Sequence, residues 1–327
     1  PPAAAGRPRQ PPSEEQIRFA VELLLDRAPT PREFRLFGRL PDLPALRQAI
    51  LAGAAPGSAP GSAPATAPPR DAAARGPDAA DLAAIEALGA GAAGEPGFIV
   101  DWFGLRTPLG IAPDLAAGAG KVLPAPVAGD SRARAAEWAG LARSVAAAAG
   151  TWHALSIGAG RGDLLLAGAV AARRRGLTPV LQASEADPRR FAALLEHAAA
   201  NGIDPAAHRF QQAEIGPAPA ARPARGASVQ DILAEAPSWD WVQVAPAGTL
   251  VPLLQGAMPL LTERVRILSL ATHGRLDEMT AIRLLSAAGW TLLAEQPAVL
   301  DLRRPKFATR SGAQVWRAPQ APRAAGA

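Results

Sequence analysis

The sequence predicts an α/β domain built on a mainly parallel sheet, preceded by a small helical module and a linker rich in Pro, Ala and Gly. Three observations predict this arrangement. Helical and strand patterns alternate from about residue 130 onward. Three glycines at alternate positions follow the first strand of that series. The tract 53–70 consists almost entirely of Gly, Ser, Pro and Ala, so it has no apolar face to bury.

Length and composition exclude several classes of protein. With 327 residues and a hydrophobic fraction of 49%, the chain can bury a substantial core. The absence of cysteine excludes disulfides, a thiolate metal site and a cysteine nucleophile, and favours a cytoplasmic protein. No apolar run approaches the roughly 20 residues of a membrane span, and the N-terminus lacks the apolar segment of a signal peptide. Because the chain begins at Pro1 without methionine, we expect further residues upstream.

The net charge of +5 comes almost wholly from arginine, since Lys121 and Lys306 are the only lysines. The arginines are spread along the chain, tyrosine is absent, and no basic stripe interleaved with aromatic residues is found. The one cluster, 173–175, falls where a helix is expected to end, and there cations complement the helix dipole. The sequence therefore does not predict a nucleic-acid partner.

The first predicted unit is a helical module at 13–52. Ser13 can cap a helix in which Ile17 and Val21 recur at helical spacing, and a second helical stretch is expected at 41–53. A disordered linker is expected at 53–80, and the main domain at 81–319.

In the main domain, strands and helices alternate. Helices are expected at 131–149, 163–175, 187–202, 228–236, 250–261 and 276–289. Strands are expected at 152–157, 178–184, 208–215, 239–245, 264–272, 290–296 and 313–318. The tryptophans on or beside these strands are expected to belong to the core.

The segment "ALSIGAGRGDLL" predicts a cofactor loop, with Gly158, Gly160 and Gly162 between a strand and a helix. A dinucleotide-binding turn would place a third glycine at Asp163, so a nicotinamide-dependent oxidoreductase is disfavoured. The GxGxG spacing is commoner in folds that bind S-adenosylmethionine, and this is the predicted cofactor.

An acidic residue follows the next strand, as a ribose-binding carboxylate should. Glu185 in "QASEADP" comes about two dozen residues after the loop and can accept hydrogen bonds from both ribose hydroxyls. Its alternative role is to cap the next helix, for which Asp187 is the better candidate. Gln212 is expected near the adenine edge. The full set of predicted cofactor-binding residues is Ser156, Gly158, Ala159, Gly160, Gly162, Glu185, Ala186, Gln212 and Ala213.

These segments resemble the FkbM methyltransferases over about residues 95–319. The resemblance rests on "GFIVDWFGLRTP", "AAEWAGLARSV", "SIGAGRGD", the stretch from "EADPRRF" to "AAHRF", "WDWVQVAPAGTL", "RVRILSLATHGRLDE", "AAGWTL" and "GAQVWRAP". It implies a class I, Rossmann-like fold with a seven-stranded sheet. It also implies O-methylation from S-adenosylmethionine on a hydroxyl of a carbohydrate or secondary metabolite. The helical module resembles one found before such domains in bacterial glycan biosynthesis.

The chain departs from the family pattern at two places. Ser156 replaces the acid expected before the glycine loop, and Ala245, Ala247 and Leu250 replace the Asp, Gln and Glu of the family's Asp-Val-Gln-Gly-Ala-Glu segment. These substitutions favour a second hypothesis, a catalytically impaired relative that serves as a binding or partner module in glycan assembly. They also remove the most plausible oxygen ligand of a metal, so no metal site is predicted.

The candidate catalytic residues lie in "ATHGRLDE", after the strand at 264–272. Because ligands of open α/β sheets bind at this strand edge, His273 is the candidate general base. The family's Thr-His-x-Arg pattern also matches here, with Glu278 as the group that orients His273 and Arg275 as a substrate contact. The alternative is that these residues only shape the turn. Asp101 and Arg106 are candidates for the acceptor pocket, with a structural salt bridge as the alternative.

Overall fold

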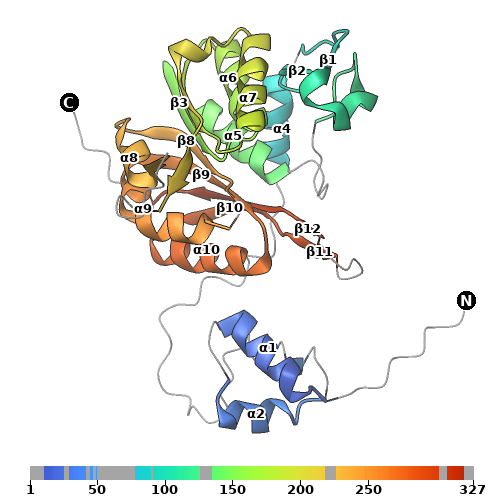
Figure 1. Ribbon diagram of the computed structural model, residues 1–327, viewed down its shortest axis with the longest axis vertical. Coiled ribbons are helices and arrows are strands. Elements are labelled where there is room, and N and C mark those ends of the chain that lie inside the picture. The colour runs from blue at the N-terminus through green and yellow to red at the C-terminus, as the bar shows by residue number, and fades with distance from the viewer. Residues whose placement is uncertain are drawn as a thin grey trace, which may run out of the picture. The chain divides into compact units, whose positions relative to one another are not determined.

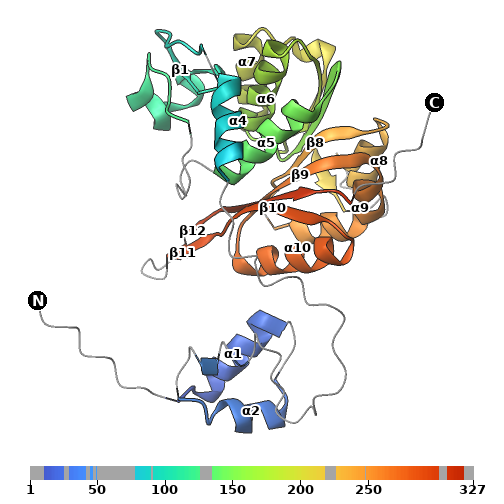
Figure 2. The same cartoon turned by 180° about the vertical axis from the view of Figure 1, so that it is seen from behind.

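The computed structural model describes residues 11–25, 29–41, 45–46, 49, 78–89, 91–125, 135–217, 226–246, 248–301 and 308–319 (Figures 1 and 2). The chain divides into two compact units, Pro1–Asp71 and Ala72–Ala327. No helix in the described ranges has the length and apolar character needed to cross a membrane.

The first unit contains α1 (Glu14–Leu25) and α2 (Pro31–Phe37), which pack around Ile17, Val21 and Phe37. Helix α2 was not predicted. It begins in a capping box, in which the Thr30 hydroxyl accepts from the Glu33 amide and the Glu33 carboxylate accepts from the Thr30 amide. Of the helix expected at 41–53, residues 45, 46 and 49 are described as helical. The expected linker lies outside the described residues as far as residue 77.

The second unit is built on a seven-stranded sheet with the order β10-β13-β9-β8-β3-β4-β5. Strands β3, β4, β5, β8 and β9 are parallel, whereas β13 runs antiparallel to both β9 and β10. The strands are β3 (Thr151–Ile157), β4 (Thr178–Ser184), β5 (Arg209–Gln211), β8 (Trp239–Val244), β9 (Val265–Thr272), β10 (Thr291–Gln296) and β13 (Gly312–Arg317). This is the order of a class I methyltransferase sheet, and it confirms the predicted fold class.

Helices cover both faces of the sheet (Figures 1 and 2). One face carries α4 (Ala79–Gly89), α5 (Ala135–Ala147), α6 (Asp163–Arg174) and α7 (Pro188–Ala200). The other carries α8 (Val229–Ala234), α9 (Leu250–Arg264) and α10 (Arg275–Ala287). Helix α4 begins two residues before the domain boundary expected from the sequence.

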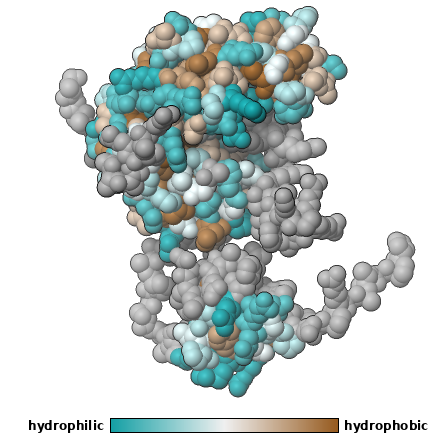
Figure 3. Space-filling view, in the orientation of Figure 1, coloured by the Kyte–Doolittle hydropathy of each residue, from teal (hydrophilic) through white to brown (hydrophobic). Residues whose placement is uncertain are grey.

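The core is anchored by buried tryptophans, as predicted. Trp152 on β3 and Trp241 on β8 stack with ring centroids 6.3 Å apart, and both are fully buried. Their indole N–H groups donate to Ser144 and Ser269, so their polar atoms are satisfied inside the protein. On the surface seen in Figure 3, hydrophobic residues are interspersed with hydrophilic ones.

Three small sheets were not predicted. They are formed by β1 (Phe98–Val100) with β2 (Arg106–Pro108), β6 (Glu214–Gly216) with β7 (Gly226–Ser228), and β11 (Val299–Asp301) with β12 (Ala308–Arg310). The expected strand 208–215 is therefore wrong as a single element, because its first part joins the main sheet and its last part pairs with β7. Short 3-10 helices complete the unit: η1 (Leu109–Ile111), η2 (Pro113–Gly118) and η3 (Pro205–Ala207).

Candidate functional site

The glycine loop joins β3 to α6 at the carboxyl edge of the sheet. Gly158, Gly160 and Gly162 all have left-handed backbones, with φ of 73°, 60° and 83°. At Gly162 a Cβ would also lie 2.4 Å from Leu194 Cδ1, so glycine lets the start of α6 pack against α7. The amides of Gly158 and Ala159 both donate to the Ser184 carbonyl at 2.9 Å, which fixes the loop against the end of β4.

Glu185 follows β4 and faces this loop. Its side chain is only 6% exposed. One carboxylate oxygen, Oε2, accepts from the Gly160 amide at 2.7 Å, and Oε1 accepts from the Asp187 amide at 2.9 Å. Since a carboxylate offers about four acceptor positions, each oxygen keeps one for a ligand hydroxyl. Asp187 caps α7 through the amides of Arg189 and Arg190, as predicted.

The residues predicted near the adenine lie beside Glu185. The Glu185 amide donates to the Gln211 carbonyl at 3.2 Å, and the Ala213 amide donates to the Glu185 carbonyl at 3.1 Å. Gln212 is exposed, as is Ala186. The structure thus brings the loop, Glu185 and the segment after β5 to one edge of the sheet, where three parallel strands end.

Ser156 lies near the end of β3 as expected, but its side chain is not open to a cofactor. Its side chain is fully buried, and Oγ donates to Gln243 Oε1 at 2.9 Å. The Gln243 amide in turn donates to Glu137 Oε1 on α5 at 3.4 Å. Ser156 therefore belongs to a polar chain inside the protein instead of facing a cofactor. This row of hydrogen-bonded side chains does contain a carboxylate, but it is that of Glu137 on α5.

His273 lies close to the glycine loop. It follows β9, with Nδ1 3.1 Å from Ser311 Oγ and Nε2 3.4 Å from the Ala245 carbonyl oxygen. Ala245 follows β8, and a Cβ on Gly158 would lie 3.1 Å from its carbonyl carbon. The candidate base, the end of β8 and the first loop glycine are therefore contiguous. Sequence reasoning missed Ser311, which is 38 positions away from His273 and belongs to no recognisable motif.

The predicted role of Glu278 needs correction, because its carboxylate does not bond to His273. Glu278 is 2% exposed, and Oε1 accepts from Thr272 Oγ1 at 3.0 Å and from the Ala298 amide. The other oxygen accepts from Arg275 Nη1 at 3.0 Å. Glu278 and Arg275 thus brace the turn after β9, and Ser311 is the side chain that bonds to the imidazole.

The departures from the family pattern near β8 leave no carboxylate at the described positions there. Ala245 offers only its backbone, Leu250 is buried in the core at the start of α9, and Ala247 lies outside the described residues. In the ranges that the structure describes, no group of three or more His, Cys, Asp or Glu side chains is placed to hold a metal ion.

Asp101 and Arg106 do not pair with each other. Arg106 forms an ion pair with Glu95 at 2.6 Å. Asp101 Oδ1 accepts from the Phe103 and Leu105 amides at 2.9 Å each. Burial raises the pKa of the Asp101 carboxyl to about 7, with the negative charge of Asp163 adding to the increase. The structural salt bridge considered as the alternative role is therefore found for Arg106, with Glu95, but not for Asp101.

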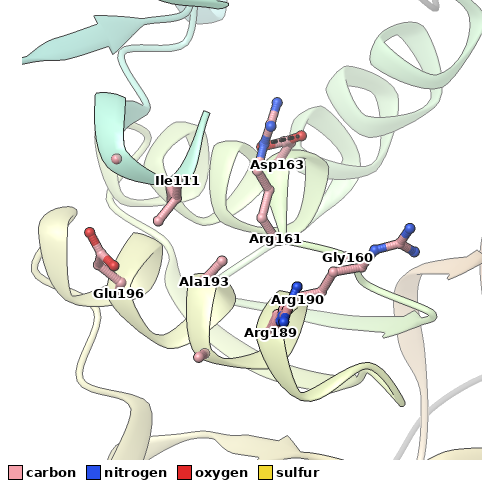
Figure 4. Close-up of a pocket in the computed structure, with 10 residues that line it drawn as sticks. Ile111, Gly160, Arg161, Asp163, Arg189, Arg190, Ala193 and Glu196 are labelled. Atoms are coloured by element: carbon pink, nitrogen blue, oxygen red, sulfur yellow. Dashed lines mark hydrogen bonds and ion pairs between the residues drawn. The ribbon is translucent and has the colours of Figure 1, made fainter. Parts of the chain in front are cut away.

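A cleft of about 580 Å³ adjoins the loop on the α7 side (Figure 4). Its walls are η1, the loop at 160–163 and the part of α7 from Arg189 to Glu196. The lining residues are Gly110, Ile111, Gly160, Arg161, Asp163, Arg189, Arg190, Ala192, Ala193 and Glu196.

Comparison with known proteins bears on the class of enzyme. No family profile matches the chain. A protein of Jannaschia sp. (strain CCS1) is 26% identical to this chain over 271 residues, which are 71% of this chain and 96% of the relative. That relative is named, provisionally, as a methyltransferase.

Three solved structures that resemble this chain are named as methyltransferases or methylases. Human methyltransferase 10 domain containing protein is 14% identical, covers 64% of this chain and 94% of its own, and has a TM-score of 0.41. Ribosomal protein L11 methylase from Lactobacillus delbrueckii subsp. bulgaricus is 16% identical over 62% and 87%, with a TM-score of 0.38. Precorrin-6y C5,15-methyltransferase from Geobacter metallireducens GS-15 is 13% identical over 55% and 86%, with a TM-score of 0.37. By its own strand order and helix placement, the chain has the class I methyltransferase fold.

Proposed function

We propose that the protein is an S-adenosylmethionine-dependent O-methyltransferase of the FkbM type that acts on a hydroxyl of a carbohydrate or secondary metabolite. The observation that carries the proposal is the Glu185 carboxylate, held at the carboxyl end of β4 by the Gly160 amide of a left-handed glycine loop. The name of the Jannaschia relative supports methyl transfer. The choice of a hydroxyl acceptor depends on the family resemblance of the sequence.

The residues at this edge fit the predicted cofactor. Glu185 would bind the two ribose hydroxyls with the acceptor positions that the Gly160 and Asp187 amides leave open. Ala186 and the segment 212–213 would flank the adenine. S-adenosylmethionine supplies an activated methyl group when it is bound, so the protein has to align the acceptor and remove one proton.

His273 would remove that proton. The Ala245 carbonyl can only accept, so its contact with Nε2 fits the tautomer in which Nε2 carries the hydrogen and Nδ1 accepts from the Ser311 hydroxyl. To act as a base, the imidazole would take the other tautomer, in which Nδ1–H donates to Ser311 Oγ and Nε2 keeps a lone pair for the acceptor hydroxyl. His273 Nε2 would accept the proton of the acceptor hydroxyl, and the bound cofactor would supply the methyl group that the hydroxyl oxygen takes up.

Calorimetric titration with S-adenosylmethionine and S-adenosylhomocysteine tests the proposal. The wild-type protein is expected to bind both, and Glu185→Gln is expected to bind them about 10- to 100-fold more weakly, since charge-assisted hydrogen bonds are lost. Glu86→Gln, an exposed change on α4, is the matched control and should bind like the wild type. Equal affinities of the Glu185→Gln variant and the wild type would contradict the assignment of the site.

The second candidate is a non-catalytic member of the fold that acts as a partner module in glycan assembly. Two observations favour it: Ser156 is enclosed in the interior, and neither Ala245 nor Leu250 offers a carboxylate to the methionyl ammonium. A folded protein that binds neither ligand at millimolar concentration would favour this candidate over the enzyme.

A further inference from the structure

The cleft beside the glycine loop presents two arginines to a ligand. Arg189 and Arg190 line it from the first turn of α7, and both side chains are exposed. Within the described ranges, no ion pair joins either guanidinium to a carboxylate within salt-bridge distance. The carboxylate of Asp187 interacts with both of their charges. Its pKa is lowered first by the hydrogen bond from the Arg190 amide, and also by the charges of Arg190 and Arg189. That carboxylate therefore serves the helix backbone and leaves both guanidinium groups open to solvent.

The third arginine of the cleft is already paired. Arg161 Nε donates to Asp163 at 2.8 and 3.1 Å, and its Nη1 lies 3.5 Å from Asp114. The close-up in Figure 4 shows the Arg161–Asp163 pair at one end of the cleft and Arg189 and Arg190 at another. The positive charge that a ligand can use is thus concentrated at the start of α7.

A negatively charged side chain lines the cleft farther along α7. Glu196 lines the cleft two turns after Arg189, is exposed, and has no ion pair in the described part of the chain. Its carboxylate can accept hydrogen bonds from hydroxyl groups but repels a second anionic group. The cleft therefore favours a ligand that is anionic at one end and hydroxylated at the other.

The walls of the cleft are preformed. His197 on α7 is buried, with Nδ1 2.9 Å from the Arg161 carbonyl and Nε2 3.0 Å from Thr107 Oγ1 on β2. These contacts tie α7, the glycine loop and the segment leading into η1 to one side chain. A volume of about 580 Å³ lies within the usual range of small-molecule sites.

We propose that this cleft binds a phosphate monoester of a polyhydroxylated molecule, such as a sugar phosphate. Arg189 and Arg190 would bind the phosphoryl group, because two guanidinium groups match a dianion with several acceptor oxygens. Glu196 would accept hydrogen bonds from the hydroxyls. The site is distinct from the proposed cofactor site, although both include the residue Gly160, and it does not depend on methyl transfer.

Equilibrium dialysis with glucose 1-phosphate, inorganic phosphate and glucose tests the proposal on the whole 327-residue chain. The wild type is expected to bind glucose 1-phosphate at least about 10-fold more tightly than either of the other two probes. Arg189→Ala with Arg190→Ala is expected to weaken glucose 1-phosphate binding by about 100-fold or more. Glu196→Gln is expected to reduce the preference for glucose 1-phosphate over inorganic phosphate. Circular dichroism establishes that each variant is folded.

Two further variants keep the result specific. Arg283→Ala, an exposed change on α10, removes one positive charge far along the sequence from this cleft and should not alter the binding. Glu185→Gln should weaken S-adenosylmethionine binding but leave glucose 1-phosphate binding intact, so the two sites can fail separately. No binding by the wild type, or equal binding by the double arginine variant, would overturn the proposal.

Discussion

The Glu185 carboxylate accepts a hydrogen bond of 2.7 Å from the Gly160 amide, and this contact joins the end of β4 to the middle of the glycine loop. Gly160 has φ of 60°, and no heavy atom lies within 4 Å of the position that a Cβ would take, so a side chain there meets strain but no clash. The contact therefore depends on the backbone conformation of one residue.

Gly160→Ala is expected to weaken S-adenosylmethionine binding, because relief of the left-handed strain of about 1–2 kcal/mol moves the amide away from Glu185. Gly176→Ala is the matched control: it has φ of 75°, equally open space and no contact with Glu185. Both variants should lose similar thermal stability, and only Gly160→Ala should lose cofactor affinity. Calorimetry and thermal melts measure the two effects, and equal affinity in both variants would refute this view of the loop.

His273→Gln is expected to lower kcat by about 100- to 10,000-fold while cofactor affinity stays the same, since it would remove the proposed general base but none of the proposed cofactor contacts. Ser311→Ala should have a smaller effect in the same direction, because it removes the partner of Nδ1 and leaves the imidazole in place. His153→Gln is the matched histidine control. The measurement is release of S-adenosylhomocysteine with a panel of hydroxylated acceptors. Turnover by His273→Gln within about threefold of the wild type would exclude it as the base.

Gln243→Leu is expected to destabilise the protein by about 1–3 kcal/mol, because the buried Ser156 hydroxyl loses its acceptor. Gln255→Leu, on the exposed side of α9, is the control and should change the free energy of unfolding by less than about 0.5 kcal/mol. Urea denaturation measures both. Equal stability of the two variants would show that the polar chain from Ser156 to Glu137 does not contribute to folding.

Asp101→Asn is expected to change the pH dependence of stability. Because the folded pKa is raised to about 7 from 3.8, the folded state binds more protons than the unfolded state between these values. Wild-type stability from this group is thus highest at low pH and is lost as pH rises towards 7. The free energy of unfolding should fall, relative to Asp101→Asn, by up to about 1.4 kcal/mol per pH unit across that window. If the free energies of unfolding of the two proteins changed in parallel with pH, the raised pKa of Asp101 would be contradicted.

The main sheet was predictable because its signal is local. The strand expected at 178–184 coincides with β4. Five of the six other expected strands lie within a few residues of their predicted limits, and the sixth, at 208–215, was found only in part. That segment has the pattern of one continuous strand, and its break follows from tertiary pairing. After Gln211 the backbone bonds to Glu185, and Glu214 then pairs with Gly226. Such distant partners leave no trace in hydrophobic periodicity.

The candidate site shows the same limit at the level of side chains. Asp187 was assigned its place correctly, because a helix cap has a fixed position at the start of a helix. Glu185 lies beside the glycine loop, and its role as the ribose acceptor stays a prediction. The hydrogen-bond partner of His273 was not predicted, because it depends on which residue of a distant turn reaches the imidazole. Glu278 bonds to Thr272 and not to His273, and a Cβ on Gly312 would lie 2.3 Å from Glu278 Oε1, so only glycine leaves room for this contact.

Strand β13 lies between β9 and β10 although it follows both in the chain. During synthesis, the ribosome therefore releases β9 and β10 before the strand that joins them exists. Until β13 inserts, both strands expose unpaired edges, which are templates for aggregation. The Ser311 hydroxyl, one residue before β13, reaches His273 only once that insertion is complete. Translation thus delays formation of the contact between Ser311 and the proposed base until β13 has been made.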